Sequence, residues 1–244
     1  YPPHHLTMGE GGAVNIVSRP PLKTYAESFR DWGRDCWCAS GKDNTCGKRF
    51  GWQLGELPKG YDHKYIYSHL GYNLKPLDPQ AAIGRCQLKK LPDFIEARKR
   101  NWEILRAGLA DLHEVFEFTL PTHATAWLEP NKRSSQSDFE AAFSWDQSGC
   151  RTNASWFGFM IRVKPGTRFS HTDLAAHLDS NKIGNRMLFG GNLLRQPVFV
   201  QLKKDRPHSF RVEGEMQGAD EIMNQALFLG TYPGLTKDQL AYEI

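Results

Sequence analysis

The stretch HLGYNLKPLDPQAAIGRCQLKKL, residues 69–91, separates an irregular half of the chain from a helical half. Asp78 is a candidate N-cap, and Pro79 suits the first turn of a helix because the fixed φ of proline is already helical. An apolar stripe that includes Ile83 and Cys86 follows at helical spacing. We therefore predict a helix from Asp78, with Cys86 on its buried face.

Downstream of this stretch, the pattern predicts alternating helices and strands. Pro92 ends or kinks the first helix, and a second helix then runs to about Leu112. Its basic residues, in PDFIEARKRNWEILR, are interspersed with acids, which predicts a solvated helix face. The further expected elements are a buried strand at 155–163, a helix at 172–184 capped by Thr172, a strand at 198–202, and helices at 219–230 and 236–244. This alternation indicates an α/β or α+β fold.

Upstream of the stretch, short elements flank a long irregular segment. Residues 13–18 predict a strand, and residues 23–33 predict a helix that closes at Gly33. Residues 34–62 are rich in Gly, Cys, Trp and charged residues and have no period. Irregular loops of this length are usually functional. Residues 121–154 are polar and aperiodic, and we interpret them as an inserted surface loop.

Composition excludes several classes of protein. The chain has 244 residues, 40% hydrophobic and 24% charged, with a net charge of +4. This length supports one or two domains with a real core. The basic residues are scattered, so we expect no nucleic-acid-binding face. No apolar run approaches the roughly 18 residues that span a bilayer, and the N-terminus lacks the pattern of a signal peptide. We therefore expect a soluble, cytoplasmic protein that contacts neither membrane nor nucleic acid.

The cysteines are unevenly distributed. They are Cys36, Cys38, Cys46, Cys86 and Cys150. An odd count without a secretory signal argues against a disulfide framework. The first three form a Cys-x-Cys-x7-Cys run in a glycine-rich loop, and thiolates bind soft metal centres. We predict metal or cluster ligation there. A zinc site completed by His63 and a group of buried free thiols are the alternatives.

The first residues carry a second chemical feature. His4 and His5 precede a Gly-Glu-Gly-Gly run in YPPHHLTMGEGGAV. Imidazole titrates near neutral pH, so either histidine can move protons. The doublet is therefore a candidate acid–base site.

Seven motifs occur in order along the chain. They are HHLTMGEGGAV, ESFRDWGRDCWC, DNTCGKRFGWQLG, GYDHKYIYSHLGYNLK, the 69–91 stretch, KIGNRMLFGGNLLRQP and IMNQALFLGTYPGLT. With them the chain resembles the CDP-4-keto-6-deoxyglucose 3-dehydrase branch of the DegT/DnrJ/EryC1/StrS sugar aminotransferase family, from Tyr1 to near Ile244 apart from 121–154. The resemblance implies an α/β fold of the aspartate-aminotransferase type, which is fold type I of the PLP-dependent transferases. Residues 1–75 would then be the C-terminal part of the large cofactor-binding domain, and 76–244 the small domain.

The resemblance also implies an activity. Family members carry, before the Gly-Glu-Gly-Gly run, a lysine that bonds covalently to pyridoxal phosphate; the matching residue here is His4, with His5 beside it. This implies that pyridoxamine phosphate is the working cofactor and that His4 is the base. The reaction would be dehydration at C3 of a CDP-4-keto-6-deoxyhexose, in 3,6-dideoxysugar and lipopolysaccharide biosynthesis. Asn73 is implied to reach the cofactor phosphate across a homodimer, the alternative being a turn residue with positive φ. Arg186 and Arg195 are candidates for the nucleotide diphosphate or for surface salt bridges.

The resemblance gives the cysteine run a role as well. Cys36, Cys38 and Cys46 would hold a 2Fe-2S cluster that passes electrons from a separate flavin/iron–sulfur reductase. The fourth ligand would lie upstream of Tyr1, because family members are longer, and the chain would be an inactive C-terminal portion. Two other interpretations stay open. One is a sugar aminotransferase or cluster-free dehydrase whose cysteines bind nothing, and the other is a zinc-bearing, non-catalytic binding module.

Overall fold

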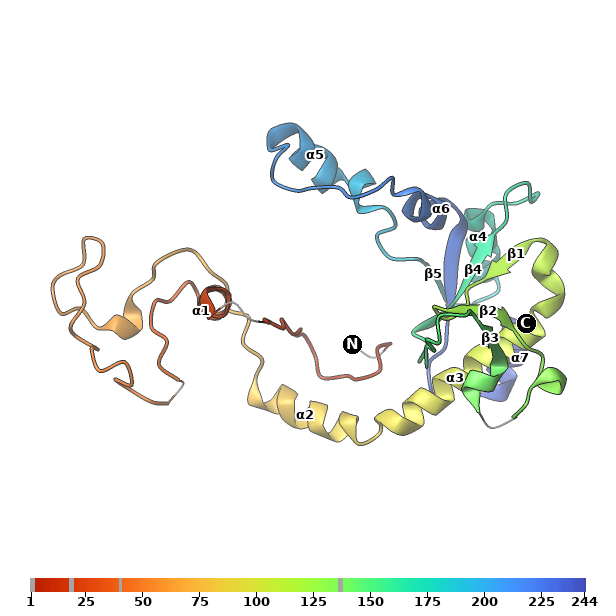
Figure 1. Cartoon of the computed structure of the whole chain (residues 1–244), viewed down its shortest axis with the longest axis horizontal. Helices are drawn as coiled ribbons and strands as arrows, with labels where there is room; N and C mark the ends of the chain where they lie inside the picture. Colours follow the sequence, from red (N-terminus) through yellow and green to blue (C-terminus); the bar gives the residue numbers. More distant parts are fainter. Residues whose placement is uncertain (1–2, 18–19, 40, 136–137) are drawn as a thin grey trace. The chain divides into compact units, whose positions relative to one another are not determined.

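The computed structural model describes residues 3–17, 20–39, 41–135 and 138–244 (Figure 1). The chain divides into two compact units. Unit 1 contains Leu6–Lys89, and unit 2 contains Lys90–Ile244 together with Pro3–His5. The histidine doublet therefore belongs to unit 2, and the cysteine loop belongs to unit 1. No helix in the described part of the chain is long and apolar enough to cross a membrane.

The described residues of unit 1 contain two α-helices and little other regular structure. They are α1 (Pro20–Arg30) and α2 (Asp78–Leu88), and a 3-10 turn, η1 (His63–Tyr65), lies between them in the sequence. The predicted helix at α2 is confirmed, but its N-cap is Leu77 and not Asp78. The backbone N–H of Leu77 donates to Gln80 Oε1 at 2.8 Å, which satisfies one donor at the helix start.

Two predictions for unit 1 are wrong. Residues 13–17 form no strand, and Ser18 lies outside the described residues. Ile83 and Cys86 are exposed on α2, and no core packs on them within unit 1. The reason is a lack of apolar partners, since Ile66 is the one fully buried hydrophobic side chain among the described residues of this unit.

Unit 2 is built on a four-stranded antiparallel sheet. Its spatial order is β1 (Phe116–Phe118), β4 (Gly158–Val163), β6 (Ala226–Gly230) and β5 (Asn185–Met187). In β4 every second residue is buried, which is the period of a strand with one face on a core. The register pairs Phe159 with Leu229 and Ile161 with Leu227 across β4 and β6, so both strands point their apolar residues to the same side.

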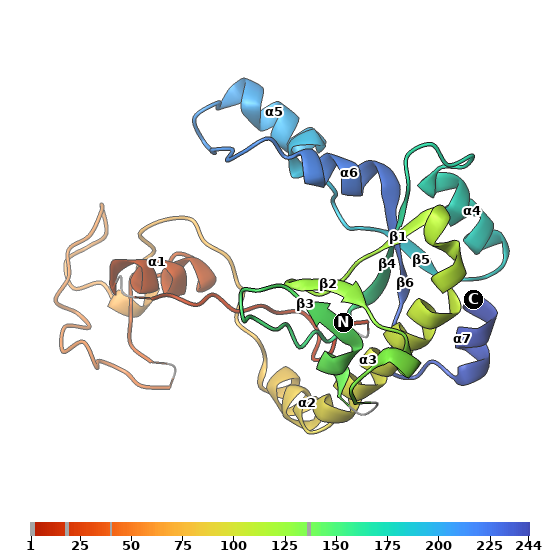
Figure 2. The same cartoon turned by 45° about the vertical axis from the view of Figure 1, so that its right-hand side comes forward.

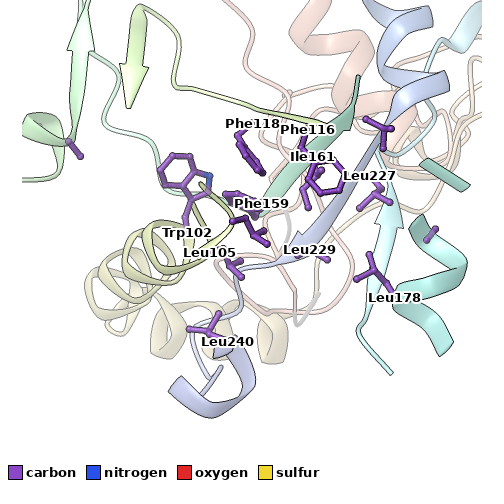
Figure 3. Close-up of a cluster of buried hydrophobic side chains, with 14 of the residues drawn as sticks. Trp102, Leu105, Phe116, Phe118, Phe159, Ile161, Leu178, Leu227, Leu229 and Leu240 are labelled. Atoms are coloured by element: carbon purple, nitrogen blue, oxygen red, sulfur yellow. The ribbon is translucent and has the colours of Figure 1, made fainter. Parts of the chain in front are cut away.

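Three helices cover that apolar face of the sheet. They are α3 (Leu91–Gly108), α4 (His171–Ser180) and α7 (Lys237–Glu243). Figure 3 shows Trp102 and Leu105 of α3, Leu178 of α4 and Leu240 of α7 gathered around the strand residues, and all four are buried. Each such side chain contributes about 1.5–3 kcal/mol by leaving water, so this cluster stabilises unit 2.

The helices predicted after Pro92 and near Thr172 are confirmed, but α3 ends at Gly108 and not near Leu112, and the predicted cap of α4 is wrong. Helix α3 is preceded by the turn at Lys89 and Lys90 and has Pro92 in its first turn, where the missing N–H costs nothing. Helix α4 begins after Ser170, whose hydroxyl accepts from the Asp173 N–H, so Ser170 and not Thr172 is the cap. The turn η2 (Ala110–Glu114) continues the polypeptide towards β1.

The segment 121–154 is not merely a surface loop. It contains a two-stranded hairpin, β2 (Ala124–Trp127) and β3 (Phe143–Trp145), with the turns η3 (Pro130–Lys132) and η4 (Phe139–Ala142) between them (Figure 2). Ala142 and Phe143 are fully buried and belong to the core of unit 2. Arg133 pairs with Glu103 of α3 at 2.9 Å. The segment is mostly polar, and a few apolar residues are enough to attach a hairpin to the core. Such residues do not stand out in the sequence.

Two further predictions failed on short segments. Residues 198–202 are helical, within α5 (Pro197–Asp205), which follows the turn η5 (Leu193–Arg195). Pro197 starts the helix, and Phe199 packs on Phe210 with ring centroids 5.6 Å apart. The helix predicted over 219–230 divides into α6 (Gln217–Gln225) and strand β6. Apolar runs of this length fit either state until tertiary partners decide.

Candidate functional site

Two paired segments of unit 1 hold the ends of the cysteine loop together. The Trp32 N–H donates to the Tyr72 carbonyl at 2.9 Å, and the Asp35 N–H donates to the Ile66 carbonyl at 2.9 Å. Residues 31–35 and 66–73 therefore close the base of the loop. At this base Gly33 has φ +80°, and a Cβ there would lie 1.8 Å from the His69 carbonyl oxygen, so only glycine fits.

An aspartate and a histidine reinforce the base. His63 is fully buried, and its Nε2 lies 2.6 Å from Asp35 Oδ2. The Ser68 hydroxyl donates to the other Asp35 oxygen at 2.7 Å. Burial of Asp35 would raise its pKa, but the bonds from His63 and Ser68 outweigh burial and lower it. Trp52 stacks on the His63 ring with centroids 4.8 Å apart, so the histidine is held on both its edge and its face.

The structure brings the three predicted cysteines together. Cys36, Cys38 and Cys46 line one cavity of about 180 Å³, and His63 lines it as well. The charged side chains around it are predominantly basic: Arg34, Lys42, Arg49 and Lys64 against Asp31 and Asp43. Thiolates together with surrounding cations suit an anionic metal–sulfur centre.

The thiols are close to one another without forming a finished ligand set. Cys38 is hydrogen-bonded to Cys36 and to Cys46, and bonds from Thr45 and the Cys46 backbone lower the pKa of Cys38 to about 6. Burial raises the pKa of Cys36. Among the described residues, no group of three His, Cys, Asp or Glu side chains has the arrangement of a metal site. The donor type and the cavity suit a cluster, whereas the ligand geometry is not preformed.

The other two cysteines lie outside this cavity. Cys86 and Cys150 are exposed free cysteines, so the expectation that Cys86 packs in a core is wrong. Neither of them lines the cavity that Cys36, Cys38 and Cys46 share, which we call the cysteine cavity.

Asn73 is exposed beside the base of the cysteine loop. It pairs with Asp31 in an isolated β-bridge, and Lys75 Nζ donates to its side-chain oxygen at 3.0 Å. Asn73 is not one of the described non-glycine residues that have a positive φ. The alternative that it is a turn residue with positive φ is therefore wrong. An exposed amide beside a lysine has the chemistry to hold a phosphate, and the role of Asn73 stays a prediction.

The histidine doublet lies against the segment that enters β4. His5 Nε2 is 2.6 Å from Ser155 Oγ, and the His4 ring packs beside Phe157 with centroids 5.1 Å apart. The Pro3 carbonyl, directly before the doublet, accepts from Arg98 Nη2 at 2.6 Å. The His4 side chain is the more exposed of the two, and His5 is partly buried.

The electrostatics favour a neutral histidine at this place. Burial lowers the pKa of His5 below its usual value of 6.5, and the nearby charge of Arg98 lowers it further. Arg98 itself is fully buried, and burial lowers its pKa too. A neutral His5 imidazole has one N–H donor and one acceptor nitrogen, so it can share a hydrogen bond with the Ser155 hydroxyl.

Sequence reasoning missed Arg98. The run EARKRN was predicted to be a solvated face, but Arg98 and Lys99 are buried on α3. The missed signal was Trp102 four residues after Arg98, which puts both on one helix face. Trp102 stacks on Trp156 with centroids 4.7 Å apart, so this face is turned to the core.

The two arginines considered for a diphosphate have other partners. Arg195 makes two bonds to the Asp220 carboxylate, at 3.1 and 2.9 Å. Arg186 donates to the Asn185 carbonyl at 2.7 Å. For Arg195, the salt-bridge alternative describes its contacts.

The chain matches one protein family over almost its whole length. The model of the DegT/DnrJ/EryC1/StrS aminotransferase family matches residues 1–243. The chain is 48% identical, over its whole length, to a lipopolysaccharide biosynthesis protein, RfbH, of Salmonella typhimurium, of which it covers 48%. It is 41% identical to dTDP-4-dehydro-2,6-dideoxy-D-glucose 3-dehydratase of Saccharopolyspora spinosa, covering 45% of that protein. The chain thus spans about half the length of the curated relatives it matches.

A solved structure supports the same assignment. A crystal structure of GDP-4-keto-6-deoxymannose-3-dehydratase with bound GDP-perosamine matches 82% of this chain and 45% of its own, with 25% identity and a TM-score of 0.53. The mixed α/β architecture agrees with that neighbour, so the predicted fold class is confirmed. A family model that spans nearly every residue, and a relative with almost half its aligned residues identical, leave one conclusion: this chain belongs to the DegT/DnrJ/EryC1/StrS aminotransferase family.

Proposed function

We propose that this chain is part of a sugar-nucleotide 3-dehydratase that uses pyridoxamine phosphate and a 2Fe-2S cluster. Its substrate would be a CDP-4-keto-6-deoxyhexose, and its product would serve 3,6-dideoxysugar and lipopolysaccharide biosynthesis. The enzyme would act in the cytoplasm as a homodimer and receive electrons from a flavin/iron–sulfur reductase. The relatives named for 3-dehydration and for lipopolysaccharide biosynthesis support this reaction class.

The observation that carries the proposal is the doublet before the Gly-Glu-Gly-Gly run. A lysine at His4 would bond covalently to pyridoxal phosphate, whereas imidazole forms no stable bond of that kind. When bound, the cofactor supplies an amine for the sugar ketone and a ring that accepts electrons. The proposed role of His4 is then to move a proton at the C4′ carbon of the cofactor while the C3 hydroxyl of the sugar leaves.

The other named residues take supporting roles in this proposal. Asn73 would hold the cofactor phosphate through its exposed amide. Cys36, Cys38 and Cys46 would supply three cluster thiolates, and the basic side chains around the cysteine cavity would offset the negative charge of the cluster. The cluster would supply single electrons for the reduction that follows loss of the hydroxyl.

A gain-of-attachment experiment tests the proposal. In His4→Lys, pyridoxal phosphate followed by borohydride should leave a cofactor adduct on the peptide that contains the substituted position, detected by mass spectrometry. The matched control is His5→Lys, which places the same amine one residue away and should capture far less cofactor. If both variants capture cofactor equally, or neither does, the assignment of His4 to the lysine position is wrong.

Metal analysis separates the remaining alternatives. The proposal expects iron and acid-labile sulfide with a visible spectrum in the intact protein. A cluster-free dehydrase or aminotransferase would bind neither. A zinc-bearing, non-catalytic module would bind zinc and no pyridoxal cofactor.

A further inference from the structure

The histidine doublet is connected to unit 2 at both of its ends. On the N-terminal side, the Pro3 carbonyl accepts from Arg98 Nη2. On the C-terminal side of His4, the His5 ring is bonded to Ser155 Oγ. His4 lies between these two fixed points, and its own ring packs on Phe157.

Both fixed points are attached to one short segment. Arg98 Nη1 donates to the Trp156 and Phe157 carbonyls at 3.1 and 3.2 Å, so the same guanidinium holds residues 156–157 and Pro3. Ser155 is the residue directly before them. The planar fork of arginine can serve several acceptors at once, which a lysine ammonium does less well.

Arg98 is an unusual residue to bury for stability alone. Its side chain is fully buried, and among the described residues no carboxylate contributes to the electrostatics of its guanidinium. A buried cation without a counter-charge is costly, and its bonds to neutral carbonyls only partly offset that cost. Such a cost is tolerated where a group has a positional task.

We propose that Arg98 and Ser155 are positioning residues. Arg98 holds the Pro3 carbonyl and Ser155 holds the His5 ring, on either side of His4, and together they fix the His4 imidazole against Phe157 for proton transfer. This inference rests on the proposed function, because it takes His4 as the base. It assigns His5 to the clamp and thereby separates the roles of the two histidines. Neither Arg98 nor Ser155 needs to touch substrate or cofactor.

The test compares clamp variants with a matched arginine on the same helix. Arg106 lies two turns along α3, is partly buried, and stacks on Phe118 and Trp127. In the intact protein, Ser155→Ala and Arg98→Lys should each lower kcat for dehydration about 10-fold, and Arg98→Met about 100-fold. KM should stay within about twofold. Arg106→Lys and Arg106→Met should leave kcat within about twofold.

A second readout works without cofactor or turnover. The charged groups acting on His5 are Arg98 from α3 and the neighbouring His4. By NMR of labelled histidine in the cofactor-free protein, Arg98→Met should raise the pKa of His5 towards 6.5, because a nearby positive charge is lost. Arg98→Lys keeps the charge and loses the fork, so the pKa of His5 should stay low while kcat falls. Arg106→Met should not change the pKa of His5.

The outcomes distinguish this inference from the proposed function. If His4→Asn abolishes dehydration while Arg98→Lys and Ser155→Ala keep kcat within twofold of wild type, the clamp is overturned and the proposed function stands. If His4→Asn retains wild-type kcat, the proposed function fails. If Arg98→Met does not fold, Arg98→Lys and Ser155→Ala decide the question.

Discussion

The histidine doublet and the cysteine loop are built by different means. The doublet contacts Ser155 and Phe157, just before β4, in a unit whose sheet and helices share one apolar core. The cysteine loop is closed by backbone pairing at Gly33 and by the Asp35–His63 bond, with Ile66 as the fully buried hydrophobic of its unit among the described residues. The proposed base is thus positioned by packing, whereas the proposed thiolate ligands would reach their final geometry only when the metal binds.

The largest effect should come from removing the proposed base. His4→Asn should lower kcat by about 10²–10⁴-fold, the usual contribution of a general acid–base group. Iron content and unfolding should not change, because the side chain is exposed and the cysteines belong to the other unit. Steady-state kinetics and iron analysis on one preparation check this. A parallel loss of iron would show that the two regions are not separately built.

The next effect should come from the core under the doublet. Phe159 is fully buried between Trp102 and Phe118, and Phe159→Ala should cost unit 2 about 3–5 kcal/mol. Hydrogen exchange should rise across β4 and β6 and change little in residues 31–35. Equal rises in both regions would contradict the contrast between them.

A smaller effect is expected at the base of the cysteine loop. Gly33→Ala forces a side chain into a positive-φ position and against the His69 carbonyl, at a cost of about 1–3 kcal/mol. Exchange of the Asp35 and Ser68 amides should accelerate. Gly47→Ala is the control, because it also has positive φ but no atom within 4 Å of the added Cβ. If amide exchange accelerates equally in both variants, the tight contact between Gly33 and His69 is not what holds the base of the loop together.

The smallest structural effect should follow loss of a thiol. Cys38→Ser should remove the absorbance of the proposed cluster and most of its iron, yet change the free energy of unfolding of unit 2 by less than about 0.5 kcal/mol. Cys150→Ser is the matched control, since that cysteine is exposed and outside the cysteine cavity. An unchanged visible spectrum in Cys38→Ser would show that Cys38 is not a cluster ligand.

Helices that begin at a proline and strands with clear alternation can be predicted from the sequence. Elements whose state depends on tertiary contacts cannot. Pro79 and Pro92 mark the starts of α2 and α3, and the alternating run at 158–163 is a strand. Pro197 marks the start of α5 in the same way, but the short apolar run at 198–202 also fits a strand. In the structure this run is helical, and Phe199 packs on Phe210.

The candidate site shows the same division. The Cys-x-Cys-x7-Cys spacing and the doublet are visible because chemistry requires those residue types. Arg98 is invisible in a basic run, because its burial follows from the stacking of Trp102 on Trp156 far along the chain. Ser155 has no local signal at all, since only the fold brings it to His5.

The most direct test of the central claim is the identity of the product. The intact protein should be supplied with pyridoxamine phosphate, CDP-4-keto-6-deoxyglucose and a reductant, and the sugar nucleotide analysed by mass spectrometry. A base at His4 without a tethering amine predicts a product that has lost one oxygen atom, at C3. A product that carries a new amino group at C4 and keeps the C3 hydroxyl would contradict the account.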